Sequence, residues 1–360
     1  MSKALHEGQE AATSGLFDQY RRIALRRAVT VAALLLLAGL AFLLDITAGP
    51  AGLGFGDVIS GILDPASLDR RTHVIIWDVR LPDALIALVV GAALSLAGVE
   101  TQTTLNNPLA SPFTLGISAA ATLGAAFFIV VAPAVGGFGQ TLLLPAFAFS
   151  FAMIAAAAIL GFSGLHGGSS TTIVLYGIAL VFLCEAMTAA LQYVASAEVI
   201  QQIVFWNMGN LTRAGWPEVA VVASVLAVIL PFSLRDVWRL TALRGGEDQA
   251  RSAGLSVTRI RIIVMIRVAI LSAVAVCFVG TIGFVGLVGP HIARMLLGED
   301  HRFLVPGACC TGAALLSLAS WLSKVIVPGA IVPVYIITAI IGVPVFLVLI
   351  SWRRKETSWQ

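Results

Sequence analysis

Charged residues are scarce in this sequence. Asp, Glu, Lys and Arg make up 11% of its 360 residues, whereas 59% of the residues are hydrophobic and the formal net charge is +3. Soluble domains carry about 25% charged residues, so this composition excludes an ordinary soluble domain. The arginines gather in short blocks between apolar segments, which excludes a continuous basic face for nucleic acid. The composition therefore indicates a membrane protein.

A phosphate-binding loop and paired cysteines are missing as well. Gly245-Gly246 is not followed by Gly-Lys-Ser or Gly-Lys-Thr, so we do not expect this chain to hydrolyse ATP or to act as an enzyme. The cysteines have no C-x-x-C spacing and no companion histidines, so no bound metal and no cofactor are predicted. We interpret all four as buried small residues: Cys184, Cys277, Cys309 and Cys310.

Long apolar runs separated by turn residues dominate the sequence instead. A helix needs about 20 mostly apolar residues to cross a bilayer. By this criterion we predict about ten membrane-spanning helices, and an all-α polytopic fold. The expected ranges are 28–44, 82–104, 114–133, 141–161, 171–195, 216–233, 259–280, 282–297, 303–322 and 333–351. The eighth range is short and rich in glycine, which leaves nine helices as the alternative.

These ranges predict one transmembrane domain over 28–351. It is flanked by a polar segment over 1–27 and a polar tail over 352–360, and no cleavage site follows the first apolar run, which is expected to remain as an anchor. Basic residues concentrate before the first helix, in the loop at about 234–258 and in the tail. Because such blocks stay in the cytoplasm, ten crossings predict cytoplasmic termini. Binding of anionic lipid is the alternative interpretation of the blocks.

The polar loop at about 234–258 contains a further helix signal. Glu247 and Asp248 precede Ala250 and a glycine at Gly254, which is typical of a short helix with acidic residues at its positive end. A short helix outside the membrane suggests a binding partner. The alternative is a solvated connection between two membrane spans.

Three motifs resemble the iron-chelate, haem and cobalamin uptake family of ABC-importer permeases. They are Trp77-Asp78-Val79-Arg80-Leu81-Pro82, Asn107-Pro108-Leu109-Ala110-Ser111-Pro112, and Gly280-Thr281-Ile282-Gly283-Phe284-Val285-Gly286-Leu287-Val288-Gly289-Pro290-His291-Ile292-Ala293-Arg294. Their order and spacing extend the resemblance over nearly the whole chain. The sequence departs from the family at Asp83, where a basic residue is frequent, and near Ser320, where an acidic residue is frequent.

The resemblance implies the partners and the substrate. Such permeases are type II importers of the bacterial inner membrane, in which two permease copies, or one copy and a sister permease, surround a central path. Two cytoplasmic ATPases drive transport, and a periplasmic or lipid-anchored binding protein delivers a metal chelate. Residues 105–112 and 201–206 look more like the ferric-siderophore branch, with haem or cobalamin as alternatives. An ion-coupled secondary transporter is the other alternative, supported only by Glu185.

The resemblance also assigns residues to the two faces of the membrane. We interpret the short polar helix as the element that couples to the ATPase, with these residues: Gly246, Glu247, Asp248, Ala250, Arg251 and Gly254. On the outer face, basic residues are expected to receive acidic knobs of the binding protein, with Arg71 as the strongest candidate. The candidates are Arg70, Arg71, Arg213 and Lys324, and solvated loop charges are the alternative.

The translocation path is expected to involve Glu185, Gly283 and Gly286. A charge at mid-helix costs about 2.5–3.5 kcal/mol to insert, so Glu185 either faces the path or is a protonated packing residue. The glycines either allow close helix packing or flex as a gate. Glu100 and Arg267 lie at similar predicted depth and are expected to pair, although Arg267 could instead extend to the membrane surface.

Several motif residues are interpreted as structural. The pair Asn107-Pro108 predicts a tight turn, with gating or ATPase contact as the alternative. His291 and Arg294 share one helix face, and a lone histidine does not make a metal site. His166 and His301 are placed in loops without a role. The structural set is Arg80, Pro82, Asn107, Pro108, Pro290, His291 and Arg294.

Overall fold

The computed structural model describes residues 2–49, 52–135, 140–165 and 169–357, and within these residues every regular element is a helix. Seven described helices are long and apolar enough to cross a membrane, and three shorter apolar helices accompany them. Together they match the ten predicted ranges one for one. They are α1 (Ser2–Thr47), α4 (Leu81–Thr104), α5 (Ile117–Val135), α6 (Gln140–Leu165), α7 (Ser170–Val194), α9 (Trp216–Arg235), α12 (Val257–Val279), α13 (Val285–Leu297), α14 (His301–Val325) and α15 (Val334–Thr357).

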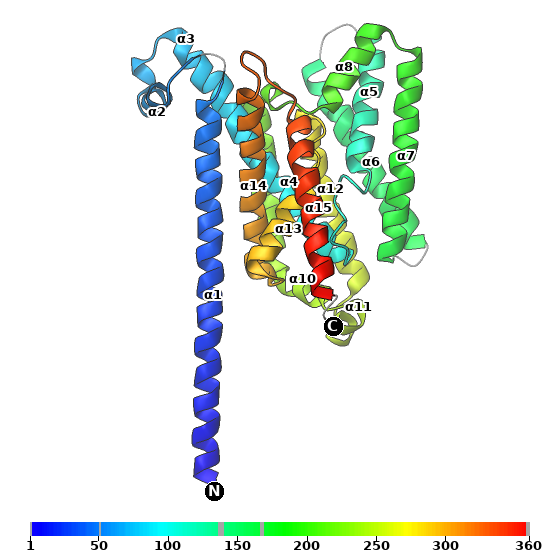
Figure 1. Ribbon diagram of the computed structural model, residues 1–360. Helices are drawn as coiled ribbons and strands as arrows, with labels where there is room; N and C mark the ends of the chain where they lie inside the picture. Colours follow the sequence, from blue (N-terminus) through cyan, green and yellow to red (C-terminus); the bar gives the residue numbers. More distant parts are fainter. Residues whose placement is uncertain (1, 50–51, 136–139, 166–168, 358–360) are drawn as a thin grey trace.

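These helices run alternately between two faces of the bundle (Figure 1). One face carries the short helices α10 (Val237–Arg244) and α11 (Glu247–Ser252), and we call it the α11 face. The opposite face, the α8 face, carries α2 (Phe55–Leu63), α3 (Arg70–His73) and α8 (Ala197–Asn207). Helix α1 begins and helix α15 ends on the side of the α11 face, as an even number of crossings requires.

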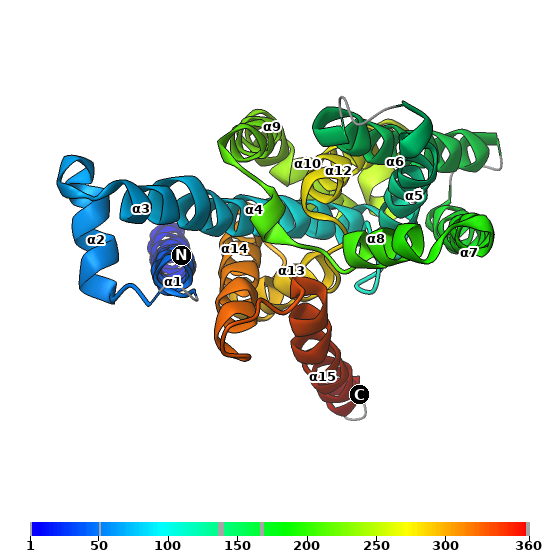
Figure 2. The same ribbon diagram turned by 90° about the horizontal axis from the view of Figure 1, so that it is seen from above.

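Helix α4 forms the centre of the bundle, with α9 and α12 on one side and α13 and α14 on the other (Figure 2). Its small residues let backbones touch. A Cβ on Gly98 would overlap the carbonyl oxygen of Gly286 on α13, and a Cβ on Gly91 would overlap the carbonyl of Gly312 on α14. In a bilayer, an apolar side chain gains nothing by moving from lipid to a helix interface, because lipid is equally apolar. Helices therefore associate largely through close packing at small residues. The contact at Gly286 therefore supports packing over flexing at this glycine.

Helix boundaries differ from the predicted ranges at the start of α1 and between α12 and α13. α1 begins at Ser2, so the polar segment over 1–27 is largely helical and continues the first membrane span beyond the bundle. Its many Ala, Gln, Glu and Arg residues favour a helix without an apolar face. α12 ends at Val279 and α13 begins at Val285, because Gly280 and Phe284 adopt φ of +78° and +65°.

Candidate functional site

The predicted short helix is present as α11 on the α11 face. Gly246, with φ of +114°, precedes it, and Gly254, with φ of +78°, follows it. The Gly254 amide donates to Arg251 and the Leu255 amide to Ala250, which is the hydrogen-bond pattern of a glycine-terminated helix. Ala250 is fully buried and fixes the helix against the bundle. The acidic first turn and the glycine stop thus have the structure that the sequence predicts.

Glu247 connects α11 to two membrane-spanning helices. Its carboxylate pairs with the guanidinium of Arg261 on α12 at 2.6 Å, and the same Arg261 nitrogen donates to the hydroxyl of Ser170 at 3.0 Å. Ser170 is the first residue of α7. A second pair, to Arg251 at 3.2 Å, stays within α11 and is largely exposed. Glu247 and Arg261 thus link α11 to the first residues of α12 and α7.

A cavity of about 700 Å³, the α7 cavity, lies beside α7. Its wall is mostly apolar, with Phe182 and Val181 from α7 and Ile336 from α15. Glu185 is exposed and lines this cavity, together with polar Gln192. Of the two readings of Glu185, the structure therefore supports the one in which it faces a cavity.

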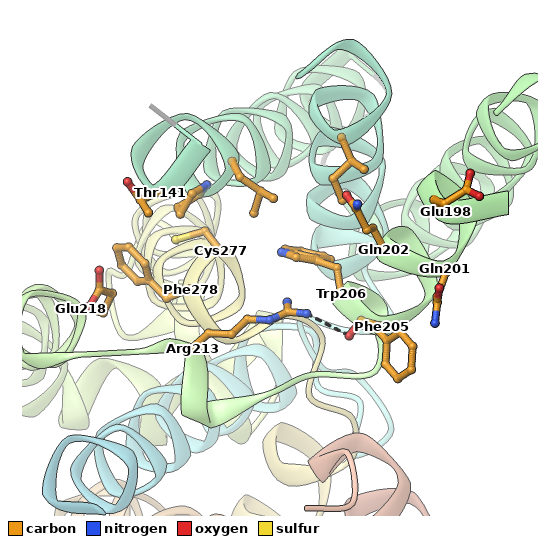
Figure 3. Close-up of a pocket in the computed structure, with 13 residues that line it drawn as sticks. Thr141, Glu198, Gln201, Gln202, Phe205, Trp206, Arg213, Glu218, Cys277 and Phe278 are labelled. Carbon is orange, nitrogen blue, oxygen red and sulfur yellow. Dashed lines mark hydrogen bonds between the residues drawn. The ribbon is translucent and has the colours of Figure 1, made fainter. Parts of the chain in front are cut away.

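A second cavity of about 500 Å³, the Trp206 cavity, lies between α5, α6, α9 and α12 on the other side of α8 (Figure 3). Trp206 and Arg213 face it, and the Arg213 guanidinium donates to the Phe205 carbonyl at 3.3 Å. Because Phe205 and Trp206 line this cavity while Val204 and Asn207 line the α7 cavity, α8 is the wall between the two.

The end of α8 is joined to the break between α12 and α13. The Asn210 amide donates to the Val279 carbonyl at 2.7 Å, and the Thr281 hydroxyl donates to the Asn207 carbonyl. A Cβ on Gly280 would overlap the Trp206 carbonyl, so glycine is required there. Gly283 faces Tyr335, a residue of the α7 cavity wall. This glycine therefore stays a candidate for the path.

The four predicted docking residues do not share one environment. Arg70 and Arg71 are exposed on α3, at the α8 face, whereas Arg213 faces the Trp206 cavity. Lys324 contradicts the prediction, because its side chain is only 4% exposed and pairs with Asp45 and Asp83, each at 2.7 Å. Its ammonium group is held between two carboxylates inside the bundle and is not available to an outside protein.

The expected pair of Glu100 and Arg267 is confirmed. Arg267 binds Glu100 at 2.8 Å and Asp236 at 2.7 Å, which makes a second buried group of one base between two acids. Replacing Arg267 or Lys324 by a neutral residue would leave buried carboxylates without a countercharge. Breaking a buried ion pair in this way strongly destabilises a protein. The pair of Lys324 and Asp83 also explains why an acidic residue stands at position 83, where the family often has a basic one. The buried Lys324 neutralises the Asp83 carboxylate.

His301 was missed by the sequence analysis. It is the first residue of α14 and is fully buried, with its ring nitrogens 2.7 Å from the Thr103 hydroxyl and 3.1 Å from the Thr241 hydroxyl. It therefore joins α4, α10 and α14, and its placement in a loop without a role is wrong. The signal was Asp300, whose carboxylate accepts from the Arg302 amide as a helix N-cap. His166 lies outside the described residues.

The remaining motif residues have local contacts. Arg80 is buried and donates to the carbonyls of Thr47 and Gly49, and Pro82 occupies the first turn of α4. The Asn107 side chain accepts from the Leu109 amide at 2.9 Å, which closes the turn that Pro108 shapes.

Residues at the α13–α14 junction are also in contact. Arg294 binds Gln102 at 2.9 Å and Glu299 at 3.1 Å, while Pro290 packs beside Gly98 and His291 is half-buried one turn before Arg294. Burial opposes ionisation of Glu299, but the hydrogen bond from Arg244 and the charge of Arg294 hold its pKa below the usual value. The described residues contain no group of three His, Cys, Asp or Glu side chains that could hold a metal ion.

Known proteins resemble this chain over most of its length. The sequence pattern of the FecCD transport family matches residues 34–352. The ferric enterobactin transport system permease protein FepD of Escherichia coli (strain K12) is 35% identical over 336 residues, which cover 92% of this chain and 97% of FepD. The hemin transport system permease protein HmuU of Yersinia pestis is 34% identical over 296 residues, covering 81% and 86% of the two chains. An inward-facing metal-chelate-type ABC transporter of solved structure has a TM-score of 0.78 at 29% identity, covering 89% of this chain and 98% of that chain.

Proposed function

The chain belongs to the FecCD transport family, and we propose that it is the membrane-spanning subunit of an ATP-driven importer that carries a ferric siderophore across the bacterial cytoplasmic membrane. The contact series from Glu247 through Arg261 to Ser170 is the observation that carries this proposal. It connects a helix outside the membrane to α7, and α7 forms one wall of the α7 cavity. Such a connection lets an event outside the membrane change a compartment within it.

In the proposed mechanism, the α11 face is cytoplasmic and two separate ATPase subunits bind there. When ATP closes the ATPases, they displace α11, and the Glu247–Arg261 pair transmits this displacement to α12 and α7. The α7 cavity then opens alternately to either side of the membrane. The chelate passes without a chemical step, so this chain needs only a compartment of the right size and charge.

A second copy of the chain, or a sister permease, is needed to close the path. The α7 cavity is lined from both α7 and α15, and these helices flank an open corner of the bundle when it is viewed from the α8 face (Figure 2). Pairing of two such corners forms one central compartment. The exposed Arg70 and Arg71 on the outer α8 face then remain the docking candidates for an acidic patch on a binding protein.

The substrate assignment follows the relatives and the sequence. One relative is named for ferric enterobactin and another for hemin, and residues 105–112 and 201–206 favour the siderophore branch. Haem or cobalamin remains the alternative substrate. An ion-coupled transporter is a weaker alternative, since Glu185 alone supports it.

The experiment reconstitutes the chain in liposomes with its ATPase and binding protein, and follows uptake of ⁵⁵Fe-labelled siderophore with and without ATP. We expect ATP-dependent uptake to fall about tenfold or more in Arg261→Gln, because an interaction of a buried charge is lost. Arg259→Gln is the matched control, since Arg259 is an arginine on the same helix α12 but is exposed to solvent. Equal defects in both variants would refute the coupling path, and uptake that needs only an ion gradient would refute the importer.

A further inference from the structure

The α7 cavity contains one kind of charge. Among the described residues that line it, Glu185 is the single charged side chain, and the other polar groups are neutral: Thr114, Thr122, Thr188, Gln192, Asn207, Thr281 and Tyr335. No arginine, lysine or histidine belongs to this lining. The compartment is thus an apolar space with an acidic side chain on its wall.

Glu185 is not neutralised by a base within the described structure. It forms no ion pair there, in contrast to Glu100, which Arg267 neutralises inside the bundle. Glu185 is also exposed on the cavity side of α7, whereas its neighbour Cys184 is buried against the bundle. Helix geometry therefore directs the carboxylate away from the protein core and into the space available to a ligand.

Two copies of this wall would place two such carboxylates around one path. Rings of acidic side chains select for cations in membrane channels, and apolar walls strengthen the effect because they screen charge poorly. A ferric chelate is too large to avoid the wall of a compartment of about 700 Å³ per subunit. An anionic chelate would therefore pass both carboxylates without any compensating base.

We infer that Glu185 is a charge filter and that the substrate is a neutral or cationic ferric chelate of the hydroxamate type, rather than a polyanionic catecholate or citrate complex. This inference rests on the proposed function, and it sharpens the substrate class. Glu185 positions no reacting group; it sets which chelates can occupy the cavity.

The test compares three ⁵⁵Fe complexes of different charge: cationic ferrioxamine B, neutral ferrichrome and anionic ferric citrate. Each is measured by equilibrium dialysis against the permease–ATPase complex in nanodiscs, without the binding protein, so that the membrane-spanning subunits select the chelate. We expect the wild-type protein to bind ferrioxamine B and ferrichrome more tightly than ferric citrate. In Glu185→Gln the ratio of ferric citrate to ferrioxamine B binding should rise about tenfold, since a charge–charge term in a poorly screened site has this size.

Glu198→Gln is the matched control, because Glu198 is also an exposed carboxylate but lines the Trp206 cavity. It should leave the ratio unchanged. The same three complexes are then followed in the ATP-driven liposome assay. An unchanged ratio in Glu185→Gln, or wild-type preference for ferric citrate, overturns the charge filter while ATP-dependent uptake still supports the importer. Absence of ATP-dependent uptake for all three complexes and for hemin overturns the proposed function instead.

Discussion

Helices α4, α12, α13 and α14, the packed half, differ from helices α6 to α8, the cavity half. In the most apolar stretch of α4, 83% of the residues are buried, and in those of α12 and α14 72%, against 28% in α6 and 17% in α7. The packed half is joined by glycine backbone contacts and by two buried acid–base–acid groups. The cavity half instead borders two cavities through α8. The same membrane fold thus combines a tightly packed half with a half whose helices line cavities.

The largest loss of stability is expected in the packed half, from Lys324→Met. The substitution removes the base between Asp45 and Asp83 and leaves both carboxylates buried, which should lower the free energy of unfolding by about 3–5 kcal/mol. Thermal unfolding of the purified protein in detergent measures the loss. Adding Asp45→Asn and Asp83→Asn to the variant should restore most of the stability, whereas Arg71→Met, at an exposed position, should have little effect. A stable Lys324→Met protein would show that the group does not hold the packed half together.

A smaller loss is expected from Gly98→Ala. The new methyl group would overlap the Gly286 carbonyl, so α4 and α13 must separate, at a cost of about 1–3 kcal/mol. The matched variant is Gly161→Ala on α6, where no atom lies within 4 Å of the added Cβ. Thermal midpoints of the two proteins compare the halves directly. Equal shifts of the thermal midpoint in both variants would show that the closer helix packing at Gly98 does not contribute to stability.

Thr281→Val acts where the two halves meet. It removes the hydroxyl that binds Asn207 and should lower the free energy of unfolding by about 1 kcal/mol, the value of a single hydrogen bond. Because Asn207 ends α8, hydrogen exchange of the α8 amides should accelerate more than that of α4. Thr188→Val, on the cavity side of α7, is the control and should leave α8 exchange as in wild type. Uniform acceleration over the whole bundle would contradict a local junction.

The smallest effect on stability is expected in the cavity half, from Glu185→Gln. An exposed side chain without an ion-pair partner contributes little to folding, so the free energy of unfolding should change by less than about 0.5 kcal/mol. The thermal midpoint checks this in the same preparations that are used for chelate binding. A large loss of stability would mean that Glu185 supports the fold and would revive its reading as a packing residue.

Sequence reasoning succeeded where the signal is local. Apolar length located the seven long and three shorter apolar helices, and the acidic turn and glycine stop located α11, because both properties depend on a few consecutive residues. Among distant contacts it predicted the pair of Glu100 and Arg267 but missed others. Lys324 lies at a helix end like any basic residue at a membrane surface, and its two acids come from α1 and α4. His301 was missed in the same way, because its partners belong to α4 and α10.

The candidate site shows the same limit. Glu185 could be singled out because a charge within an apolar helix is rare, but the sequence could not show on which side of α7 the carboxylate lies. The contact series from Glu247 through Arg261 to Ser170 could not be predicted either, because Arg261 is one of many arginines between 234 and 261.

Helix α1 is much longer than a membrane span requires. Its 46 residues extend about 69 Å at 1.5 Å per residue, more than twice the roughly 30 Å thickness of a hydrocarbon core. Its first turns therefore stand clear of the bundle (Figure 1). A fluorophore attached at the start of α1 would lie beyond the bundle on the side of the α11 face, and energy transfer to a labelled ATPase would test whether that subunit binds at this face.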